Sequence, residues 1–243
     1  MKRMTAFAGR NGKELLRDPV TLIFGVALPV ALLAVMSLIQ SNAPVEVFAI
    51  RSLAPGIAAF SLAFVSMFAA MLIAKDKSTS FLLRVFASPM LPWEYILGYA
   101  LPMLPIGAAQ CVVCFLTALC FGLPFGWNTL GAVAVLLPSA VLYTAFGLLF
   151  GVLLSDKQAA PVNSILVQCA ALLGGTWFAP SLVGGAFETI CNLLPFVHAT
   201  ESARAALAGD YAAALPHLAW IAGWAVLLFV AAVLLFKKKM QEN

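Results

Sequence analysis

The segment KDKSTSFLLRVFASPMLPWEY, residues 75–95, separates two long apolar runs and holds five charged side chains. The run before it, Leu53–Ala74, and the run after it, Ile96–Phe121, contain no charged residue. A helix needs about 20 apolar residues to cross a bilayer, and both runs exceed that length. The segment is therefore predicted to be a polar connection between two membrane spans.

The composition of the whole chain agrees with that prediction. Of its 243 residues, 63% are hydrophobic and 10% are charged, whereas soluble domains have about 45–50% apolar and about 25% charged residues. The mean hydropathy is +1.01. The net charge of +4 is spread over short segments beside apolar runs, and it lacks the clustering on a polar surface that nucleic-acid binding needs. We expect an integral membrane protein that does not bind nucleic acid.

Six apolar runs are long enough to span, which predicts an all-α membrane protein with six transmembrane helices. We treat residues 1–243 as a single transmembrane domain. The predicted spans are Val20–Ile39, Leu53–Ala74, Ile96–Phe121, Leu130–Leu154, Pro161–Val183 and His217–Phe236.

The positions of lysine and arginine predict the orientation of these spans. With the N-terminus inside, twelve of the 14 cations lie in cytoplasmic segments, and two, Arg51 and Arg204, lie outside. Cytoplasmic segments of membrane proteins carry such an excess of cations. We expect a multi-pass protein of a bacterial cytoplasmic membrane, with both termini in the cytoplasm.

Two segments outside the spans are expected to form short helices. In residues 1–18, helical spacing places most charged side chains on one face and a less polar set, Met4, Phe7, Ala8, Asn11 and Leu15, on the other. This pattern predicts an interfacial helix with its cations toward anionic lipid; a disordered basic tail is the alternative. In the outer segment 184–216, Pro195 divides two apolar pieces, Phe187–Leu194 and His198–Leu207. Each piece is too short to span, so we expect two short helices at the outer face, one or both re-entrant.

The chain lacks the motifs of several catalytic and transport mechanisms. The sequence has no phosphate-binding loop of the G-x-x-x-x-G-K-[ST] type, which argues against ATP hydrolysis by this chain. No aspartate, glutamate, lysine, arginine or histidine lies in the middle of a predicted span, which argues against a proton-driven carrier. The C-x-x-C of Cys111 and Cys114 lies within an apolar run without a second pair, and packing is its simpler interpretation.

A few polar residues remain as candidates for a role within or beside the membrane. Asn163, Ser164 and Gln168 lie in the fifth predicted span, where they either line a pathway or bond neighbouring helices. His198 and Glu201 are three residues apart, as in a proton-transfer or metal pair, but too few ligands are near in sequence for a metal site. Helix capping or local hydrogen bonding is the alternative for that pair.

Residues 53–104 resemble the type-two permease family of ABC exporters. The matching features are Pro55-Gly56 at the start of a span, the charged Lys75–Lys77, Leu82 to Arg84, Ala87-Ser88-Pro89, Trp93-Glu94 and Gly98. The sequences KELLRDPVTLIFGVALPV, residues 13–30, and LLPFVHATESARAALAGD, residues 193–210, are similar to the same family. One departure is that Asp76–Ser80 replaces the family's E-x-G-T stretch.

The resemblance implies a permease subunit of an ATP-driven exporter, with a second permease copy, identical or not, and membrane lipid as further partners. A separate ABC ATPase subunit would bind ATP, so the chain itself needs no cofactor or metal. The segment Lys75–Glu94 would hold a coupling helix pressed into the ATPase; packing of its apolar face on the bilayer is the alternative. Its ATPase contacts would be Phe81, Leu82, Arg84, Val85 and Phe86.

The exported substrate would be an amphipathic drug, a lipid or a glycan-type molecule, among which the sequence does not choose. Two other functions stay open at this point. One is a membrane-embedded lipid-modifying enzyme that uses His198, Glu201 and Arg204, and the other is an ion-coupled carrier.

Overall fold

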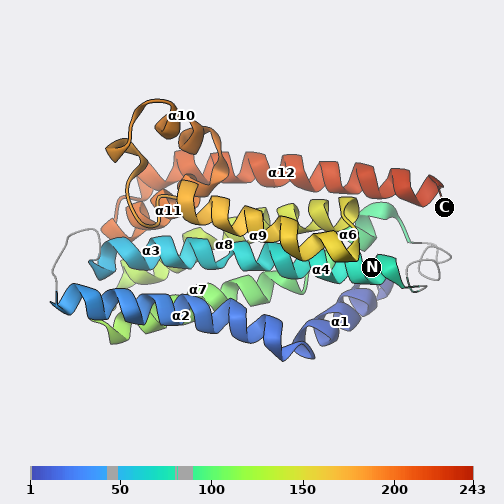
Figure 1. The fold of residues 1–243 in the computed structure, drawn as a ribbon, viewed down its shortest axis with the longest axis horizontal. Coiled ribbons are helices and arrows are strands. Elements are labelled where there is room, and N and C mark those ends of the chain that lie inside the picture. Colours follow the sequence, from blue (N-terminus) through green and yellow to red (C-terminus); the bar gives the residue numbers. More distant parts are fainter. Residues whose placement is uncertain (1, 43–48, 80, 82–89, 243) are drawn as a thin grey trace.

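The computed structural model describes residues 2–42, 49–79, 81 and 90–242, and its regular elements in those ranges are helical (Figure 1). This confirms the predicted all-α fold class. The helices are α1 (Lys2–Leu16), α2 (Pro19–Asn42), α3 (Ile50–Ser61), α4 (Ala63–Ser78), α6 (Pro92–Ala100), α7 (Met103–Cys120), α8 (Trp127–Leu153), α9 (Asp156–Leu173), the 3-10 turn η2 (Pro180–Leu182), α10 (Gly185–Leu193), α11 (Pro195–Ala208) and α12 (Tyr211–Glu242).

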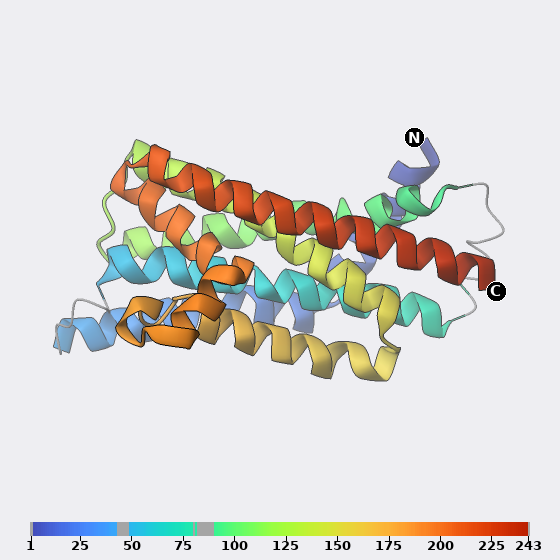
Figure 2. The ribbon, with the colours of Figure 1, turned by 90° about the horizontal axis from the view of Figure 1, so that it is seen from above.

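The long helices lie side by side along one axis, and both termini lie at the same end of the bundle (Figures 1 and 2). The end of α4 and the start of α6 lie at this terminal end too, so it also carries the described parts of segment 75–95 (Figure 1). Within the described ranges, five stretches are long and apolar enough to cross a membrane: Gly25–Asn42, Ile50–Ser78, Pro92–Cys120, Trp127–Leu153 and Tyr211–Gln241.

The predicted span Pro161–Val183 is misplaced at both ends. Helix α9 starts earlier, at Asp156, where the Ser155 backbone N–H and hydroxyl both donate to Gln158 Oε1, at 3.1 and 2.8 Å. It ends at Leu173, because Gly174 and Gly175 follow and Gly175 has a φ of +65°, which favours glycine. Helix α9 runs along the bundle but does not belong to the five stretches that are long and apolar enough to span.

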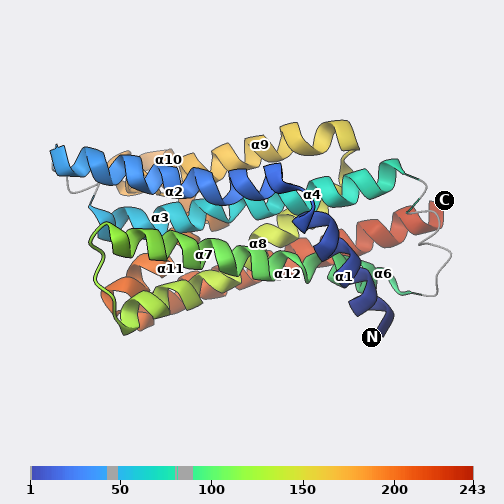
Figure 3. The same cartoon turned by 90° about the horizontal axis from the view of Figure 1, so that it is seen from below.

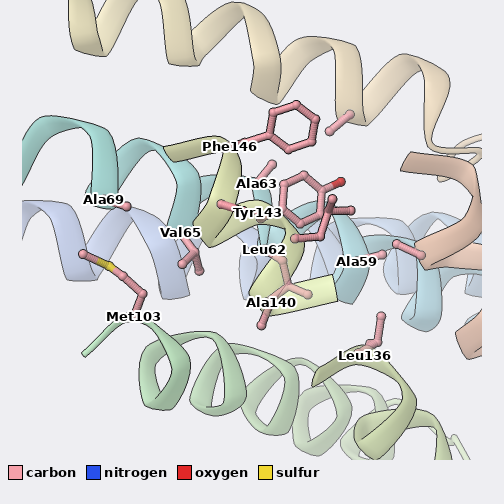
Figure 4. Close-up of a cluster of buried hydrophobic side chains, with 14 of the residues drawn as sticks. Ala59, Leu62, Ala63, Val65, Ala69, Met103, Leu136, Ala140, Tyr143 and Phe146 are labelled. Atoms are coloured by element: carbon pink, nitrogen blue, oxygen red, sulfur yellow. The ribbon is translucent and has the colours of Figure 1, made fainter. Parts of the chain in front are cut away.

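The core of the bundle is built around the contact of α4 with α8 (Figure 4). The fourth predicted span contains Gly147-x-x-x-Gly151, a spacing that permits close helix approach. A Cβ on Gly147 would lie 2.3 Å from the Ser66 carbonyl oxygen, and one on Gly151 would lie 2.8 Å from the Ile73 Cβ. The two glycines therefore allow α8 to pack directly on the backbone of α4.

Buried amide side chains satisfy the backbone where prolines interrupt helical hydrogen bonding. Pro29 has no N–H for the Gly25 carbonyl one turn earlier in α2. The Gln110 amide of α7 donates to that carbonyl at 2.9 Å. This bond ties the first and third spans together, and it explains how the buried proline is tolerated.

The two short helices predicted in segment 184–216 are present as α10 and α11. Pro195 is the first residue of α11, as the break between the two apolar pieces predicted. Helix α11 packs against α3, α8 and α12, and most of its residues from Pro195 to Ala206 are buried. It therefore lies within the end of the bundle rather than on its surface (Figure 2).

Candidate functional site

The N-terminal helix α1 crosses the terminal end of the bundle beside α4 and α6 (Figure 3). Its residues Phe7, Asn11 and Leu15 are buried, as the helical spacing predicted for its less polar face. That face packs on protein, and the placement of α1 at the membrane interface stays a prediction. The tertiary structure thus uses α1 to bind the beginning and the end of segment 75–95.

A charged pair joins α1 to the end of α4. The Arg10 guanidinium donates to both carboxylate oxygens of Asp76, at 2.6 and 3.0 Å, and Tyr99 Oη of α6 donates to the same carboxylate at 2.9 Å. The Asp76 side chain is 5% exposed. Three donors from two helices therefore hold one buried carboxylate, a bidentate geometry that fixes the orientation of both side chains.

A second bond joins α1 to α6. The Asn11 amide donates at 3.1 Å to the Gly98 carbonyl, which lacks its usual helical partner because Pro102 has no N–H. A Cβ on Gly98 would lie 2.4 Å from the Phe7 ring. Glycine at this position allows α1 to approach closely enough for the Asn11 bond.

Aromatic contacts extend this arrangement to Phe81, the only described residue of the predicted ATPase-contact set. The Phe81 ring stacks on the Phe7 ring with centroids 6.4 Å apart, and the Arg10 guanidinium lies 4.1 Å from the Phe81 centroid. Phe7 also meets Tyr99 edge to face at 4.9 Å. We call Phe7, Arg10, Asn11, Asp76, Phe81 and Tyr99 the α1 cluster.

The remaining predicted ATPase contacts lie outside the described residues. They are Leu82, Arg84, Val85 and Phe86. Their contact with a partner, and that of Phe81, stays a prediction.

An exposed ion pair lies beside the α1 cluster. Lys75 Nζ donates to Glu14 Oε1 at 2.9 Å. This hydrogen bond, together with the ammonium charge, lowers the pKa of Glu14 below its ordinary value. The pair adds a second ion pair between α1 and α4, weaker than that of Arg10 and Asp76, since exposed ion pairs contribute little.

The predicted pathway residues divide between two faces of α9. Asn163 is buried, accepts a hydrogen bond from Ser66 of α4 at 2.7 Å and donates to the Ala159 carbonyl at 2.8 Å. Of the two alternatives from the sequence, helix bonding is what the structure shows for Asn163. Ser164 and Gln168, four residues apart on the exposed face of α9, share an apolar groove of about 340 Å³.

The polar residues of α11 make structural contacts. Arg204 donates to Glu201 Oε1 at 2.7 Å, to the Gly175 carbonyl at 2.8 Å and to the Ser52 carbonyl at 3.3 Å. His198 lies with its Nδ1 at 2.7 Å from Nδ1 of His217, a residue 19 positions later. Among the described residues, no group of three metal-ligating side chains is found.

Most residues of the α1 cluster are not marked as a site by their sequence pattern. Asp76 was placed in a charged connection, although its position at the end of an apolar run was a signal that its carboxylate needs a partner. Asn11 fell on the less polar side of the predicted α1 helix, and a lone amide there was a signal of a buried hydrogen bond. The identity of the partners, Gly98 and Tyr99, depends on tertiary packing.

A comparison with models of protein families finds a match to most of this chain. The model described as ABC-2 type transporter matches residues 3–208. That range includes α1, both described ends of segment 75–95, and α11. No curated protein matches the sequence significantly.

Proposed function

This chain belongs to the ABC-2 type transporter family, and is thus a membrane permease subunit of an ABC transporter; we propose that it is an exporter subunit driven through segment 75–95. A separate ATPase subunit binds and hydrolyses ATP in this proposal. The substrate is an amphipathic drug, a lipid or a glycan-type molecule that moves out of the cytoplasm.

The observation that carries the proposal is the attachment of segment 75–95 to α1 by the α1 cluster. Force applied at the segment acts on Asp76, which is hydrogen-bonded to Arg10, and on Phe81, whose ring stacks on that of Phe7. Through Tyr99 and Asn11 the same cluster reaches α6. A push on this segment would therefore move α1, α4 and α6 together, as a rigid-body change between two states requires.

The direct test is purification of the full chain from its native membranes in mild detergent. We expect an ATPase subunit to co-purify and the sample to hydrolyse ATP. Transport by a preparation of the chain without any ATPase, or flux that depends on a proton gradient alone, would contradict the proposal and favour an ion-coupled carrier.

A second test concerns the segment itself. Replacing Phe81, Arg84 and Phe86 together by alanine is expected to leave the protein inserted but to uncouple transport from ATP hydrolysis. The matched control replaces Phe121, Lys157 and Tyr211 by alanine, which removes two exposed aromatic rings and one exposed cation outside segment 75–95. Equal transport by the first variant and the wild type would refute the coupling role.

A second permease copy completes the proposed transporter. In this proposal the apolar groove of α9 faces the substrate. The support is the exposed pair Ser164 and Gln168 on an otherwise apolar groove, a combination that suits an amphipathic molecule. Gln168→Leu is expected to reduce transport while the ATPase still co-purifies, whereas the control Ile165→Leu in the same groove is expected to transport normally. Unchanged transport by Gln168→Leu would remove this groove from the pathway.

A lipid-modifying enzyme is disfavoured by the contacts of α11. Its proposed catalytic residues Glu201 and Arg204 bond each other, and Arg204 also holds two backbone carbonyls. The family to which the chain belongs supplies transport subunits, and catalysis of ATP hydrolysis is assigned here to the partner.

A further inference from the structure

A pocket of about 350 Å³ lies at the end of the bundle opposite the termini. It is formed by the turn between α7 and α8, together with Arg51 of α3 and Leu207 of α11. Candidate spans begin at Ile50 and Trp127 and end at Cys120. The pocket therefore lies where the spans leave the bilayer, at the level of lipid headgroups.

The turn that forms the pocket is held in one conformation. Gly122 has a φ of +95°, and the following Leu123 is buried, with its N–H donating to the Ala118 carbonyl at 3.0 Å. The Thr129 hydroxyl donates to the Pro124 carbonyl at 2.9 Å. These bonds fix the backbone that carries the aromatic residues of the turn.

Two aromatic side chains of the turn point away from the protein. Phe125 is 74% exposed and Trp127 is 84% exposed. In water this would leave large apolar surfaces unburied. At the membrane interface the same rings are stabilised, because tryptophan combines an apolar body with a polar N–H.

Arg51 supplies a cation to the pocket. Within the part of the chain that the structure describes, its guanidinium makes no ion pair or hydrogen bond, whereas Arg204 at the same end bonds Glu201 and two carbonyls. Among the residues that the structure describes, the pocket lining contains no carboxylate. Asp210, which follows the α11 helix, accepts a hydrogen bond from the Ala213 N–H at 2.9 Å.

We propose that this pocket binds the phosphate-bearing headgroup of an anionic membrane lipid. The phosphate lies against the Arg51 guanidinium, a geometry that the planar fork of arginine suits. The acyl chains lie along the rings of Phe125 and Trp127. The complementary charge selects an anionic over a zwitterionic lipid, and the pre-formed turn reduces the entropy lost on binding.

The experiment uses the full-length protein in nanodiscs and the fluorescence of Trp127, taken as the difference between wild type and Trp127→Phe. One set of discs contains brominated phosphatidylglycerol, which quenches tryptophan on contact, and the other contains brominated phosphatidylcholine. We expect phosphatidylglycerol to be preferred roughly fivefold at this site, the ratio expected for one cation beside an anionic lipid. Added salt should weaken the preference because the pocket is open to solvent.

Arg51→Gln should abolish the preference, while the matched control Arg3→Gln, which removes a cation at the opposite end, should retain it. Arg51→Lys should keep part of it. Equal quenching by the two lipids, or a preference that survives Arg51→Gln, would overturn the proposal. Competition by soluble glycerol phosphate would overturn the assignment to a lipid and point to a free phosphate compound.

Discussion

The two ends of the bundle each use an arginine to join helices, but they join different kinds of group. At the terminal end, Arg10 binds the side chain of Asp76 and covers the ring of Phe81. At the opposite end, Arg204 binds the backbone carbonyls of Ser52 and Gly175. The contacts of Arg10 depend on where the Asp76 and Phe81 side chains lie. Those of Arg204 are made to backbone carbonyls near the start of α3 and just after the end of α9.

This difference indicates different mechanical roles. The α1 cluster connects three helices to segment 75–95, where the proposed ATPase contact lies. The Arg204 contacts hold α11 between α3 and the turn after α9, and α11 is buried in the end of the bundle. The terminal end is thus arranged to transmit movement, and the opposite end to keep α11 in place.

The largest effect is expected for Asp76→Ala. Loss of the carboxylate leaves the Arg10 guanidinium partly buried without its charge partner, which costs about 3–5 kcal/mol of unfolding free energy. Thermal unfolding in detergent measures this loss. The control is Asp156→Ala, an exposed acid in the first turn of α9, for which the loss should be about 0.3–1 kcal/mol; similar losses for the two variants would contradict the role of Asp76.

A smaller loss, about 1.5–3 kcal/mol, is expected for Arg204→Gln, since hydrogen bonds from a charged donor contribute that much. If the opposite end is only structural, this variant should lose stability while its remaining folded fraction transports normally. Arg51→Gln, which removes an arginine without described partners from the same end, should leave stability unchanged. Loss of ATP-coupled transport per folded molecule in Arg204→Gln would remove the distinction between the two ends.

Asn11→Leu tests whether α1 transmits movement to α6. The lost bond to the Gly98 carbonyl costs about 1 kcal/mol, the net contribution of a typical hydrogen bond. Gln110→Leu removes the equivalent bond to the Gly25 carbonyl between α2 and α7. Both variants should unfold at similar temperatures, but only Asn11→Leu should weaken ATP-coupled transport; equal transport by the two would show that the Asn11 bond is structural alone.

The smallest effect is expected for Glu14→Gln, which breaks an exposed pair worth about 0.2–1 kcal/mol. Lys75 lowers the pKa of Glu14 in the folded protein, so the pair stabilises the fold above the unfolded pKa of Glu14. That contribution is lost as the pH falls through the lowered folded pKa. Wild type and Glu14→Gln should therefore differ in unfolding temperature at neutral pH and converge in acid; a difference that grows in acid would contradict this assignment.

The sequence predicted the helices well where apolar runs had clear ends. The runs Val20–Ile39 and Leu130–Leu154 correspond to α2 and α8 within a few residues, and Pro195 marked the start of α11. The prediction was wrong at Val183, because an apolar run continues past Gly174 and Gly175 although the helix does not. Hydropathy predicts which segments are buried in lipid or protein, but it does not predict that the pair Gly174 and Gly175 ends helix α9.

The sequence alone determined that this is an all-helical membrane protein and that segment 75–95 is polar between two spans. Both properties depend on local composition: apolar length sets the spans, and charge sets their ends. Only the tertiary structure decided that segment 75–95 is bonded to α1, because Arg10 and Asp76 are 66 residues apart. Their pairing depends on the packing of α1 across α4 and α6, and the periodicity of the sequence does not predict that packing.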